Sequence, residues 1–263
     1  MAEARSGAGG FLGNGGRVFF PGDDRLEGVL EWPESMTGDD LPMGEEVSSW
    51  LAGGVVVAHP HPLHGATMDQ PVVYRIAKCC RKRGFVTLRF NFRGVGRSAG
   101  FYSGDQEYRD VGAALSFLAG QLAALGGDTE PSAACLPLGL AGYSFGSVMA
   151  ARIAAGGPVP VRALALVTFP VRWEEMPPDT AERLAAYRGP VLAVCAEHDD
   201  IAPPEEVEEA LRGLGLDFRL SLVEGVGHFL EGKHLEVGEL VADFMAEVVG
   251  RASAKARPTP GPK

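Results

Sequence analysis

Continuous apolar runs recur along the chain and predict strands that are buried on both faces of a sheet. These runs cover residues 54–58, 85–90, 136–141, 162–169, 191–195 and 216–223. Stretches with an apolar stripe at helical spacing alternate with them and predict helices. These stretches cover residues 71–83, 105–118, 147–155, 181–188, 203–214 and 234–249. Strand and helix therefore alternate, which predicts an α/β fold with a mostly parallel sheet and helices on both faces.

The N-terminal region follows a different pattern. Two short runs, RVFF at 17–20 and LEGVLEW at 26–32, flank the turn-forming residues PGDD. This arrangement predicts an antiparallel hairpin at one edge of the sheet. We expect flexible tails over residues 1–16 and 251–263 and a single domain over residues 17–250, because no repeat or change in composition marks a domain boundary.

Composition narrows the class of protein further. The chain has 263 residues, of which 46% are hydrophobic, and its net charge of −10 argues against non-specific binding to nucleic acid or to anionic membranes. No run reaches the roughly 18 consecutive apolar residues of a membrane-spanning helix, and the N-terminal residues lack the pattern of a secretory signal. The cysteines, at 79, 80, 135 and 195, form no C-x-x-C pair. Free thiols in a reducing cytoplasm are therefore expected.

The stretch LPLGLAGYSFGSVMAARIAA, residues 136–155, joins a predicted strand to a helix of small residues through the turn GYSFG. A G-x-S-x-G sequence in this setting is typical of a nucleophile elbow, where the serine hydroxyl stands clear of the sheet. Gly142 and Gly146 leave room for neighbouring backbone, and the positive end of the helix dipole suits a developing oxyanion. The alternative is an ordinary turn in which Ser144 caps the helix, although a cap does not need both glycines.

A second G-x-S-x-G match occurs at residues 96–100, GRSAG. The residues before Ser98 are a loop rather than an apolar strand, and the residues after it do not begin a helix. Ser98 therefore lacks the setting of a nucleophile. The surrounding RGVGRS stretch is rich in glycine, but it lacks the spacing of a phosphate-binding loop and is followed by no G-K-S/T. We therefore assign no nucleotide to it.

A serine becomes a nucleophile when a base takes its proton and a third group orients that base. Functional side chains of a parallel sheet collect beyond the carboxyl ends of its strands. His228 lies there, in the glycine-flanked loop GVGHF after the last predicted strand. Asp199 and Asp200 both follow the strand VLAVC, and we assign the orienting role to Asp199 and a helix-capping role to Asp200. The candidate triad is therefore Ser144, Asp199 and His228.

The oxyanion of acyl transfer needs two N–H donors. The backbone N–H of Phe145, next to the nucleophile at the start of the helix, is the first candidate. The second is expected from the loop HPHPLHG at residues 59–65, which follows the strand GVVVA. Proline has no N–H, so this donor comes from His61 or from a residue from Leu63 onward. His59 is expected to pack and hydrogen-bond beneath the site.

The order Ser, Asp, His is that of the triad in the α/β-hydrolase fold, and the sequence is similar to that superfamily. It resembles the small, lidless serine hydrolases near the dienelactone-hydrolase-like esterases over roughly residues 20–250. The resemblance rests on the segments AHPHPLHGATMDQPVVYRIA, LRFNFRGVGRS, GYSFGS, AEHDDIAPP and GVGHF.

The resemblance carries several further expectations. It implies an eight-stranded, mostly parallel sheet with an antiparallel N-terminal edge. Asp199 matches the aspartate of the family's G-x-x-D-x-x-x-P loop, with Ala196 in place of the glycine. The backbone N–H of His61 matches the family's second oxyanion donor, with Pro60 where a glycine is usual. The RGVGRS loop matches one that supports the elbow.

The spacing of His59, His61 and His64 suggests an alternative chemistry. It resembles the H-x-H-x-D-H motif of metallo-β-lactamase-like hydrolases, which hold two zinc ions. Leu63 occupies the position of the aspartate ligand, however, and a metal site leaves the GYSFG turn unexplained. A non-catalytic binding protein that retains a relic site is a third class. The serine-hydrolase interpretation accounts for more of these motifs and requires no metal or organic cofactor.

Ester hydrolysis through an acyl-enzyme is the expected reaction, and hydrolysis of thioesters is the nearest alternative. Larger relatives carry a helical lid before the strand that bears the acid, whereas residues 169–190 leave room for only one short helix. The site should therefore be open, and small or exposed acyl groups are the expected substrates. Tyr143, Trp173 and Met176 are candidate substrate contacts, and Tyr102 is a further one. The sequence does not indicate an oligomeric state.

Overall fold

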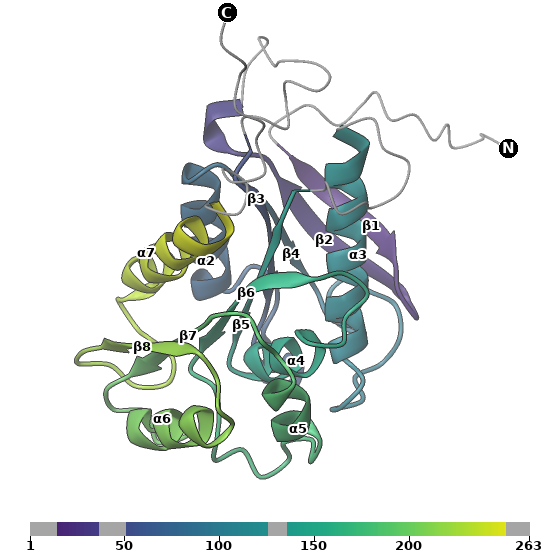
Figure 1. Cartoon of the computed structure of the whole chain (residues 1–263). Helices are drawn as coiled ribbons and strands as arrows, with labels where there is room; N and C mark the ends of the chain where they lie inside the picture. Colours follow the sequence, from purple (N-terminus) through teal and green to yellow (C-terminus); the bar gives the residue numbers. More distant parts are fainter. Residues whose placement is uncertain (1–14, 37–50, 126–135, 251–263) are drawn as a thin grey trace, which may run out of the picture.

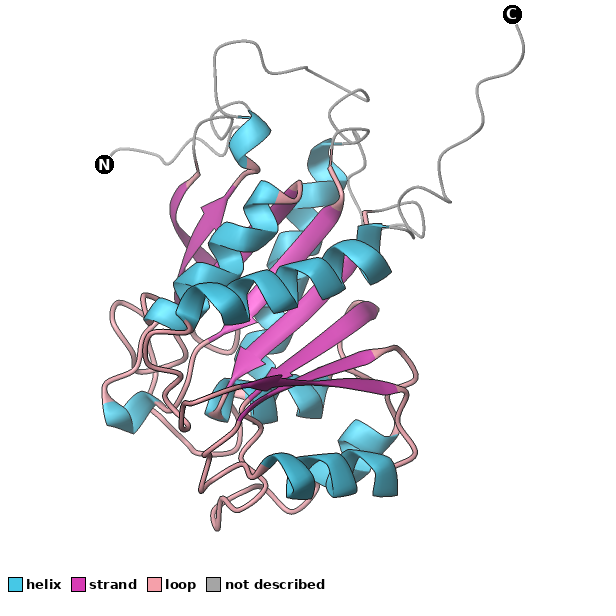
Figure 2. Ribbon diagram, turned by 90° about the vertical axis from the view of Figure 1, so that its left-hand side faces the viewer, coloured by secondary structure: helices cyan, strands magenta, loops and turns pink. Residues whose placement is uncertain are grey.

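The computed structural model describes residues 15–36, 51–125 and 136–250. In these ranges it contains one sheet of eight strands in the order β1-β2-β4-β3-β5-β6-β7-β8. The strands are β1 (Gly16–Pro21), β2 (Arg25–Glu31), β3 (Gly53–Ala58), β4 (Phe85–Phe90), β5 (Leu138–Tyr143), β6 (Val161–Val167), β7 (Val191–Ala196) and β8 (Phe218–Val223). Figure 2 shows them as a twisted layer flanked by helices.

The strand pairing confirms the predicted α/β-hydrolase fold. β1 and β2 form an antiparallel hairpin, and β2 pairs antiparallel with β4. All other neighbours run parallel. The carboxyl ends of β3 to β8 consequently lie along one edge of the sheet, where the loops that follow these strands can bring distant residues together.

Helices cover both faces of the sheet, as Figure 1 shows. They are α2 (Pro71–Lys82), α3 (Tyr108–Leu125), α4 (Phe145–Ile153), α5 (Thr180–Ala185), α6 (Pro204–Gly213) and α7 (His234–Met245). Three short turns of other helical types are η1 (Glu34–Met36), η2 (Pro62–His64) and the π-helical η3 (Ala246–Gly250).

Side chains of β3 alternate between two hydrophobic cores. Val55 and Val57 belong to the core that includes residues of α2 and α7, whereas Val56 and Ala58 belong to the core that includes residues of α3, α4 and α6. Successive side chains of a strand point to opposite faces, so a strand covered on both sides must be apolar at every position. This explains why β3 reads as a continuous β-branched run instead of an alternating one.

Two element boundaries differ from the sequence prediction near the serine turn. β5 continues to Tyr143 instead of ending at Ala141, because Gly142 pairs with Ala58 and Tyr143 pairs with Val167. α4 begins directly at Phe145. The turn between strand and helix is therefore a single residue, Ser144, which is tighter than the predicted five-residue turn.

The start of α3 also differs from the prediction. The helix begins at Tyr108 instead of residue 105 and continues to Leu125. Ser103 and Glu107 hold the preceding residues in a turn: the Ser103 hydroxyl accepts the N–H of Gln106, and the Glu107 carboxylate accepts the N–H of Ser103. Such side-chain bonds offer the backbone an alternative to helix and delay its start.

The interval between β6 and β7 contains one short helix, α5, and no larger helical insertion. This agrees with the predicted absence of a lid. Of the expected terminal tails, residues 1–14 and 251–263 lie outside the described residues, while Gly16 already belongs to β1.

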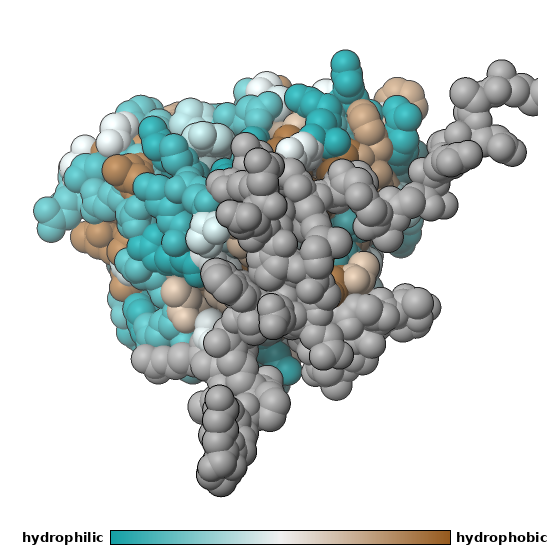
Figure 3. Space-filling model, turned by 90° about the horizontal axis from the view of Figure 1, so that it is seen from above, coloured by the Kyte–Doolittle hydropathy of each residue, from teal (hydrophilic) through white to brown (hydrophobic). Residues whose placement is uncertain are grey.

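Cys79, Cys80 and Cys195 are free and buried, and Cys135 lies outside the described residues. No helix in the described ranges is long and apolar enough to cross a membrane. The part of the described surface that is visible from above in Figure 3 is largely hydrophilic, with hydrophobic residues in small separate groups.

Candidate active site

Ser144 occupies the junction of β5 and α4 in an unusual backbone conformation. Its φ is 52° and its ψ is −119°, a sparsely populated region that costs a non-glycine residue about 1–3 kcal/mol. The Ser144 N–H donates to the carbonyl of Val167 over 2.9 Å, and its own carbonyl accepts the N–H of Ser147 over 2.8 Å. The Ser144 side chain makes no helix-capping hydrogen bond, so the simple capping interpretation does not describe this turn.

Both glycines of the turn are required by close backbone contacts. A Cβ on Gly142 would lie 2.2 Å from the carbonyl oxygen of Gly146. A Cβ on Gly146 would lie 2.5 Å from the carbonyl oxygens of both Ala58 and His59. These contacts draw the first turn of α4 against the end of β3. They also place the serine turn beside the loop that begins at His59.

The structure brings the three predicted triad residues together from the loops after β5, β7 and β8. Ser144 Oγ lies 2.8 Å from His228 Nε2, and His228 Nδ1 lies 2.8 Å and 2.9 Å from the two carboxylate oxygens of Asp199. An ionised carboxylate can only accept, so His228 Nδ1 carries the proton. Nε2 of the neutral ring is then free to accept the hydroxyl proton of Ser144.

Asp199 is buried and held in one orientation. Its Oδ1 accepts the N–H groups of Ile201 and Ala202 over 2.9 Å and 2.8 Å. Burial alone would raise the pKa of the Asp199 carboxyl, but the hydrogen bond from His228 and these two amides together hold it below its ordinary value. The group is therefore an anion at neutral pH. The predicted capping role of Asp200 is wrong, because Pro203 is the N-cap of α6 and makes no side-chain cap.

The loop that carries His228 is anchored to the loop that carries Asp199. The N–H groups of Glu197 and His198 donate to the carbonyls of Val223 and Val226, over 3.0 Å and 2.9 Å. The Glu197 carboxylate in turn accepts the N–H of Gly225 over 2.8 Å. Sequence reasoning did not single out Glu197, because an acidic residue in a loop gives no signal of its hydrogen-bond partner.

The backbone amides of Phe145 and His61 are the predicted oxyanion donors. Both residues line the same cavity as Ser144. Within the described ranges, neither amide donates a hydrogen bond to the protein. Phe145 is the first residue of α4, where N–H groups have no partner within the helix.

The three histidines of the HPHPLH stretch have different environments. His59 is fully buried; its Nδ1 lies 2.6 Å from the carbonyl oxygen of Pro60, and its Nε2 accepts the N–H of Phe92 over 3.1 Å. Burial lowers the pKa of His59 to about 4. The rings of His61 and His64 stack at 4.6 Å and face the cavity.

This arrangement does not match a dinuclear metal site. Both nitrogens of His59 are occupied by backbone partners, so its ring does not converge with those of His61 and His64. Across the described ranges, no three His, Cys, Asp or Glu side chains gather as a possible metal-binding group. His228, the remaining candidate ligand, is bonded to Ser144 and Asp199 instead.

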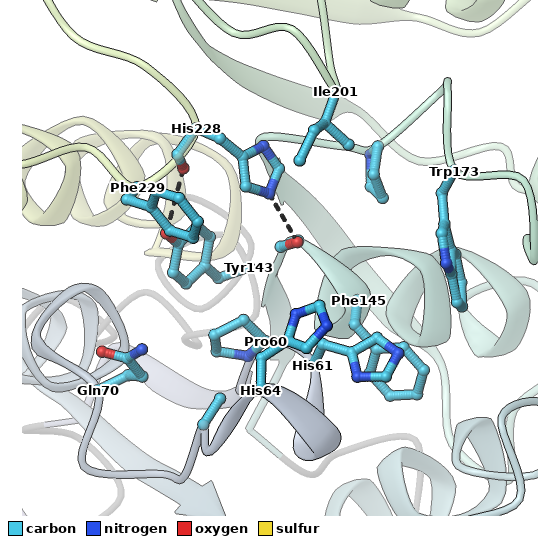
Figure 4. Close-up of a pocket in the computed structure, with 13 residues that line it drawn as sticks. Pro60, His61, His64, Gln70, Tyr143, Phe145, Trp173, Ile201, His228 and Phe229 are labelled. Atoms are coloured by element: carbon cyan, nitrogen blue, oxygen red, sulfur yellow. Dashed lines mark hydrogen bonds between the residues drawn. The ribbon is translucent and has the colours of Figure 1, made fainter.

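The cavity at Ser144 has a volume of about 190 Å³ and mostly apolar walls. Figure 4 shows His228 pointing toward its centre, with Tyr143 and Phe229 on one side and Phe145 and Trp173 on the other. The Tyr143 hydroxyl donates to the carbonyl of His228 over 3.1 Å, which fixes this ring against the histidine loop. Of the predicted contact residues, Tyr143 and Trp173 line this cavity, whereas Met176 and Tyr102 line a neighbouring one.

Comparison with known proteins gives one relative by sequence. No protein-family model matches the chain. The uncharacterized protein RP471 of Rickettsia prowazekii is 28% identical over 206 residues, which cover 73% of this chain and 78% of RP471.

Several solved structures have a fold similar to that of this chain. An α/β serine hydrolase homologue from Coxiella burnetii is 28% identical, with a TM-score of 0.67 over 86% of this chain and 95% of that one. XC6422 from Xanthomonas campestris, described as an α/β serine hydrolase without a lid, is 24% identical, with a TM-score of 0.69 over 89% and 94% of the two chains. The fold is thus shared with known serine hydrolases, one of which is described as having no lid.

Proposed function

Since the chain belongs to the α/β-hydrolase superfamily, we propose that it is a serine hydrolase that cleaves small carboxylic esters. Ser144 is the nucleophile, His228 the general base and Asp199 the residue that orients the base. The observation that carries this proposal is the unbroken hydrogen-bonded series from Ser144 Oγ through His228 to Asp199 at the wall of an apolar cavity.

Acylation begins when the substrate carbonyl carbon lies against Ser144 Oγ. As Oγ attacks, its proton passes to His228 Nε2, and the imidazolium that forms is stabilised by the Asp199 carboxylate. The tetrahedral intermediate collapses as the protonated His228 gives this proton to the leaving alkoxide, and the alcohol departs. The acyl group remains on Ser144 as an ester.

Deacylation repeats the same steps with water. His228 takes a proton from water, whose oxygen attacks the acyl-enzyme, and then returns the proton to Ser144 Oγ as the carboxylic acid leaves. Protein side chains and water complete both half-reactions, so the proposal includes no cofactor.

The Phe145 and His61 amides are the proposed oxyanion donors. A negative charge develops on the carbonyl oxygen in each tetrahedral intermediate, and two backbone N–H groups without other partners can bind it without rearrangement. Gly146 supports this role indirectly, because its missing side chain lets α4 approach the β3 loop that holds His61.

The size and polarity of the cavity favour small, apolar acyl groups. Its volume of about 190 Å³ lies below the roughly 300–1,000 Å³ of pockets that enclose drug-sized ligands. The short α5 segment adds no cover that would enclose a long chain. The three free cysteines in the described ranges support a reducing compartment as the place of action.

Hydrolysis of p-nitrophenyl acetate and butyrate tests the proposal directly. We expect turnover by the wild type that a strong chelator does not reduce, and loss of turnover in Ser144→Ala. Ser98→Ala is the matched control, since it removes the serine of the second G-x-S-x-G sequence. Activity that survives Ser144→Ala but disappears with the chelator would overturn the serine mechanism. The acetyl and butyryl thioesters, assayed alongside, decide between esterase and thioesterase.

A further inference from the structure

A second cavity lies next to the one at Ser144. Its volume is about 590 Å³, and it lies between the loop after β4 and the loop after β6. Trp173 lines both cavities. The two spaces are therefore adjacent, and the side chains around Trp173 form the wall that separates them.

His61 and Tyr102 complete this wall. His61 lines the first cavity and Tyr102 lines the second. The two side chains are joined by a hydrogen bond of 3.0 Å between His61 Nε2 and the Tyr102 hydroxyl. His61 Nδ1 accepts the N–H of Leu63 over 3.2 Å, so in the neutral ring the proton is on Nε2, and Nε2 donates to Tyr102.

Ring packing fixes the position of Tyr102 within the wall. Its ring centre lies 5.2 Å from that of His61 and 5.9 Å from that of Phe145. Trp173 in turn lies 5.8 Å from His61 and 5.7 Å from Phe145, with both rings edge-on. His61 and Phe145 thus each pack against both Tyr102 and Trp173 at ordinary aromatic distances, and the four rings form one cluster beside the two cavities.

The direction of the substrate follows from the proposed mechanism. The leaving oxygen must reach His228 Nε2, and the carbonyl oxygen faces the amides of His61 and Phe145. The acyl chain is the remaining substituent. In Figure 4 the side of the cavity bounded by Trp173 lies opposite Tyr143 and Phe229, so an acyl chain that extends toward Trp173 meets the wall.

We propose that Tyr102 is a specificity-determining residue, which limits the length of the acyl chain by closing the cavity at Ser144 from the cavity beyond Trp173. This inference rests on the proposed ester hydrolysis. Met176, Pro177 and Pro178 form the apolar part of the lining of the second cavity, which also contains the charged residues Asp105, Arg152, Glu174, Glu175 and Asp179. A chain that passes the wall would extend along the apolar part. The predicted contact with Met176 would then form only after the wall is opened.

The test compares kcat/KM for p-nitrophenyl butyrate and octanoate in the wild type, Tyr102→Ala and Tyr102→Phe. Removal of the Tyr102 ring opens the wall behind His61 and takes away the hydrogen-bond partner of His61 Nε2, and we expect the two cavities to join. Each further methylene that becomes buried favours binding about fourfold. We expect the octanoate-to-butyrate ratio to rise about tenfold or more in Tyr102→Ala, since burial of four added methylenes is partial. Tyr102→Phe keeps the ring and should keep the wild-type ratio.

Phe101→Ala is the matched control. Phe101 precedes Tyr102, is 88% exposed and lines neither cavity, so its variant should keep the wild-type ratio. Trp173→Ala opens the same wall from the other side and should raise the ratio even if Tyr102→Ala folds poorly. An unchanged ratio in folded Tyr102→Ala and Trp173→Ala overturns the inference.

One further outcome would also overturn part of the inference. A gain with long alcohols, measured with methyl and octyl butyrate, but not with long acyl chains would overturn the assignment of the acyl chain to this side. The ratio is independent of the absolute rate, so it is distinct from the test of the proposed function. Loss of all turnover in Ser144→Ala concerns the mechanism, whereas the ratio concerns the wall.

Discussion

The chain contains the same pentapeptide pattern twice, and the two copies have different surroundings. At residues 142–146 the serine hydroxyl faces a cavity and meets His228. At residues 96–100 the serine is buried: the Ser98 hydroxyl donates to the carbonyl of Asn91 over 2.7 Å and accepts the N–H of Glu27 over 2.9 Å. Ser98 thus ties the loop after β4 to β2, while Ser144 lies at the cavity beside His228.

The glycines of the two copies also serve different needs. Gly142 and Gly146 prevent collisions with backbone atoms of each other and of β3. Gly96 and Gly100 have φ values of +59° and +83°, and a Cβ on Gly100 would meet the Asp24 carboxylate at 2.2 Å. The first pair permits close packing of a helix on a strand, and the second permits left-handed turns. The comparison teaches that a motif acquires its chemistry from the elements on either side of it.

The largest expected difference between the two serines is in activity. Ser144→Ala should lower kcat for ester hydrolysis by about 100,000-fold or more, because the nucleophile is lost. Ser98→Ala should keep kcat close to the wild-type value. Both variants are measured with p-nitrophenyl butyrate. Comparable losses in the two variants would show that Ser98 also takes part in the reaction.

Asp199 lies near Ser144 and Glu27 lies near Ser98, and substitution of these two carboxylates should affect activity differently. Asp199→Asn should lower kcat about 10,000-fold, because an amide cannot hold His228 in the required tautomer. Glu27 accepts hydrogen bonds from Asn91 Nδ2 and the Arg97 N–H, both over 2.8 Å, and pairs with Arg17. Glu27→Gln should keep kcat and instead lower the free energy of unfolding by about 1–3 kcal/mol. Steady-state kinetics and urea unfolding separate the two effects.

Asp199 also contributes stability that depends on pH. Its folded pKa is lowered, so this contribution is present above the unfolded pKa, near 3.9, and is lost as pH falls through the folded value. As the pH falls from about 6 to about 3, a range that includes the unfolded pKa near 3.9, the unfolding free energy of the wild type should therefore decrease relative to that of Asp199→Asn. A constant difference over this range contradicts the assigned charge.

The next largest expected effect is the loss of stability when the glycines of the two copies are substituted. Gly146→Ala forces the helix away from two backbone carbonyls that cannot give way independently, and we expect a loss of about 3 kcal/mol or more in unfolding free energy together with a lower kcat. Gly100→Ala meets the end of the Asp24 side chain, which can rotate, and mainly adds the strain of a positive φ. Its cost should be about 1–2 kcal/mol with kcat retained.

His59 connects the two regions, because it joins the loop after β3 to Phe92 in the loop after β4. Its pKa falls from 6.5 to about 4; the unfolded chain therefore binds more protons between these values, and stability decreases as pH falls from 6.5 toward 4. From pH 8 to pH 5 the loss should be about 2 kcal/mol. His59→Gln should remove this part of the pH dependence in urea unfolding. An equal slope in both proteins contradicts the buried, neutral state.

The smallest expected effect is on the stability of Ser98→Ala. Loss of one buried donor and acceptor should lower the free energy of unfolding by about 1–2 kcal/mol, which corresponds to a decrease in Tm of roughly 2–8 °C for a domain of this size. Differential scanning calorimetry is sensitive enough for this shift. No change in Tm would indicate that water replaces the hydroxyl in both hydrogen bonds.

Much of the fold was accessible from hydrophobic periodicity, since a strand covered on both faces must be apolar at every position. β4 spans the predicted residues Phe85–Phe90, and the antiparallel hairpin was predicted from its turn. Element ends near the site were less accessible. α3 starts later than predicted because Ser103 and Glu107 bind nearby backbone, and such bonds depend on side-chain orientation.

The sequence by itself determined which residues are the candidates for the chemistry and would come together: Ser144 through its strand–turn–helix setting, and Asp199 and His228 through their places after strands. Residue type and local order suffice there, because parallel strands bring their carboxyl ends to one edge. Only the tertiary structure decided that Asp199 accepts the N–H groups of Ile201 and Ala202 while Asp200 caps no helix, and that Tyr102 lies within hydrogen-bond distance of His61. Those features depend on contacts between side chains and loops after folding, and such contacts cannot be predicted from local sequence patterns.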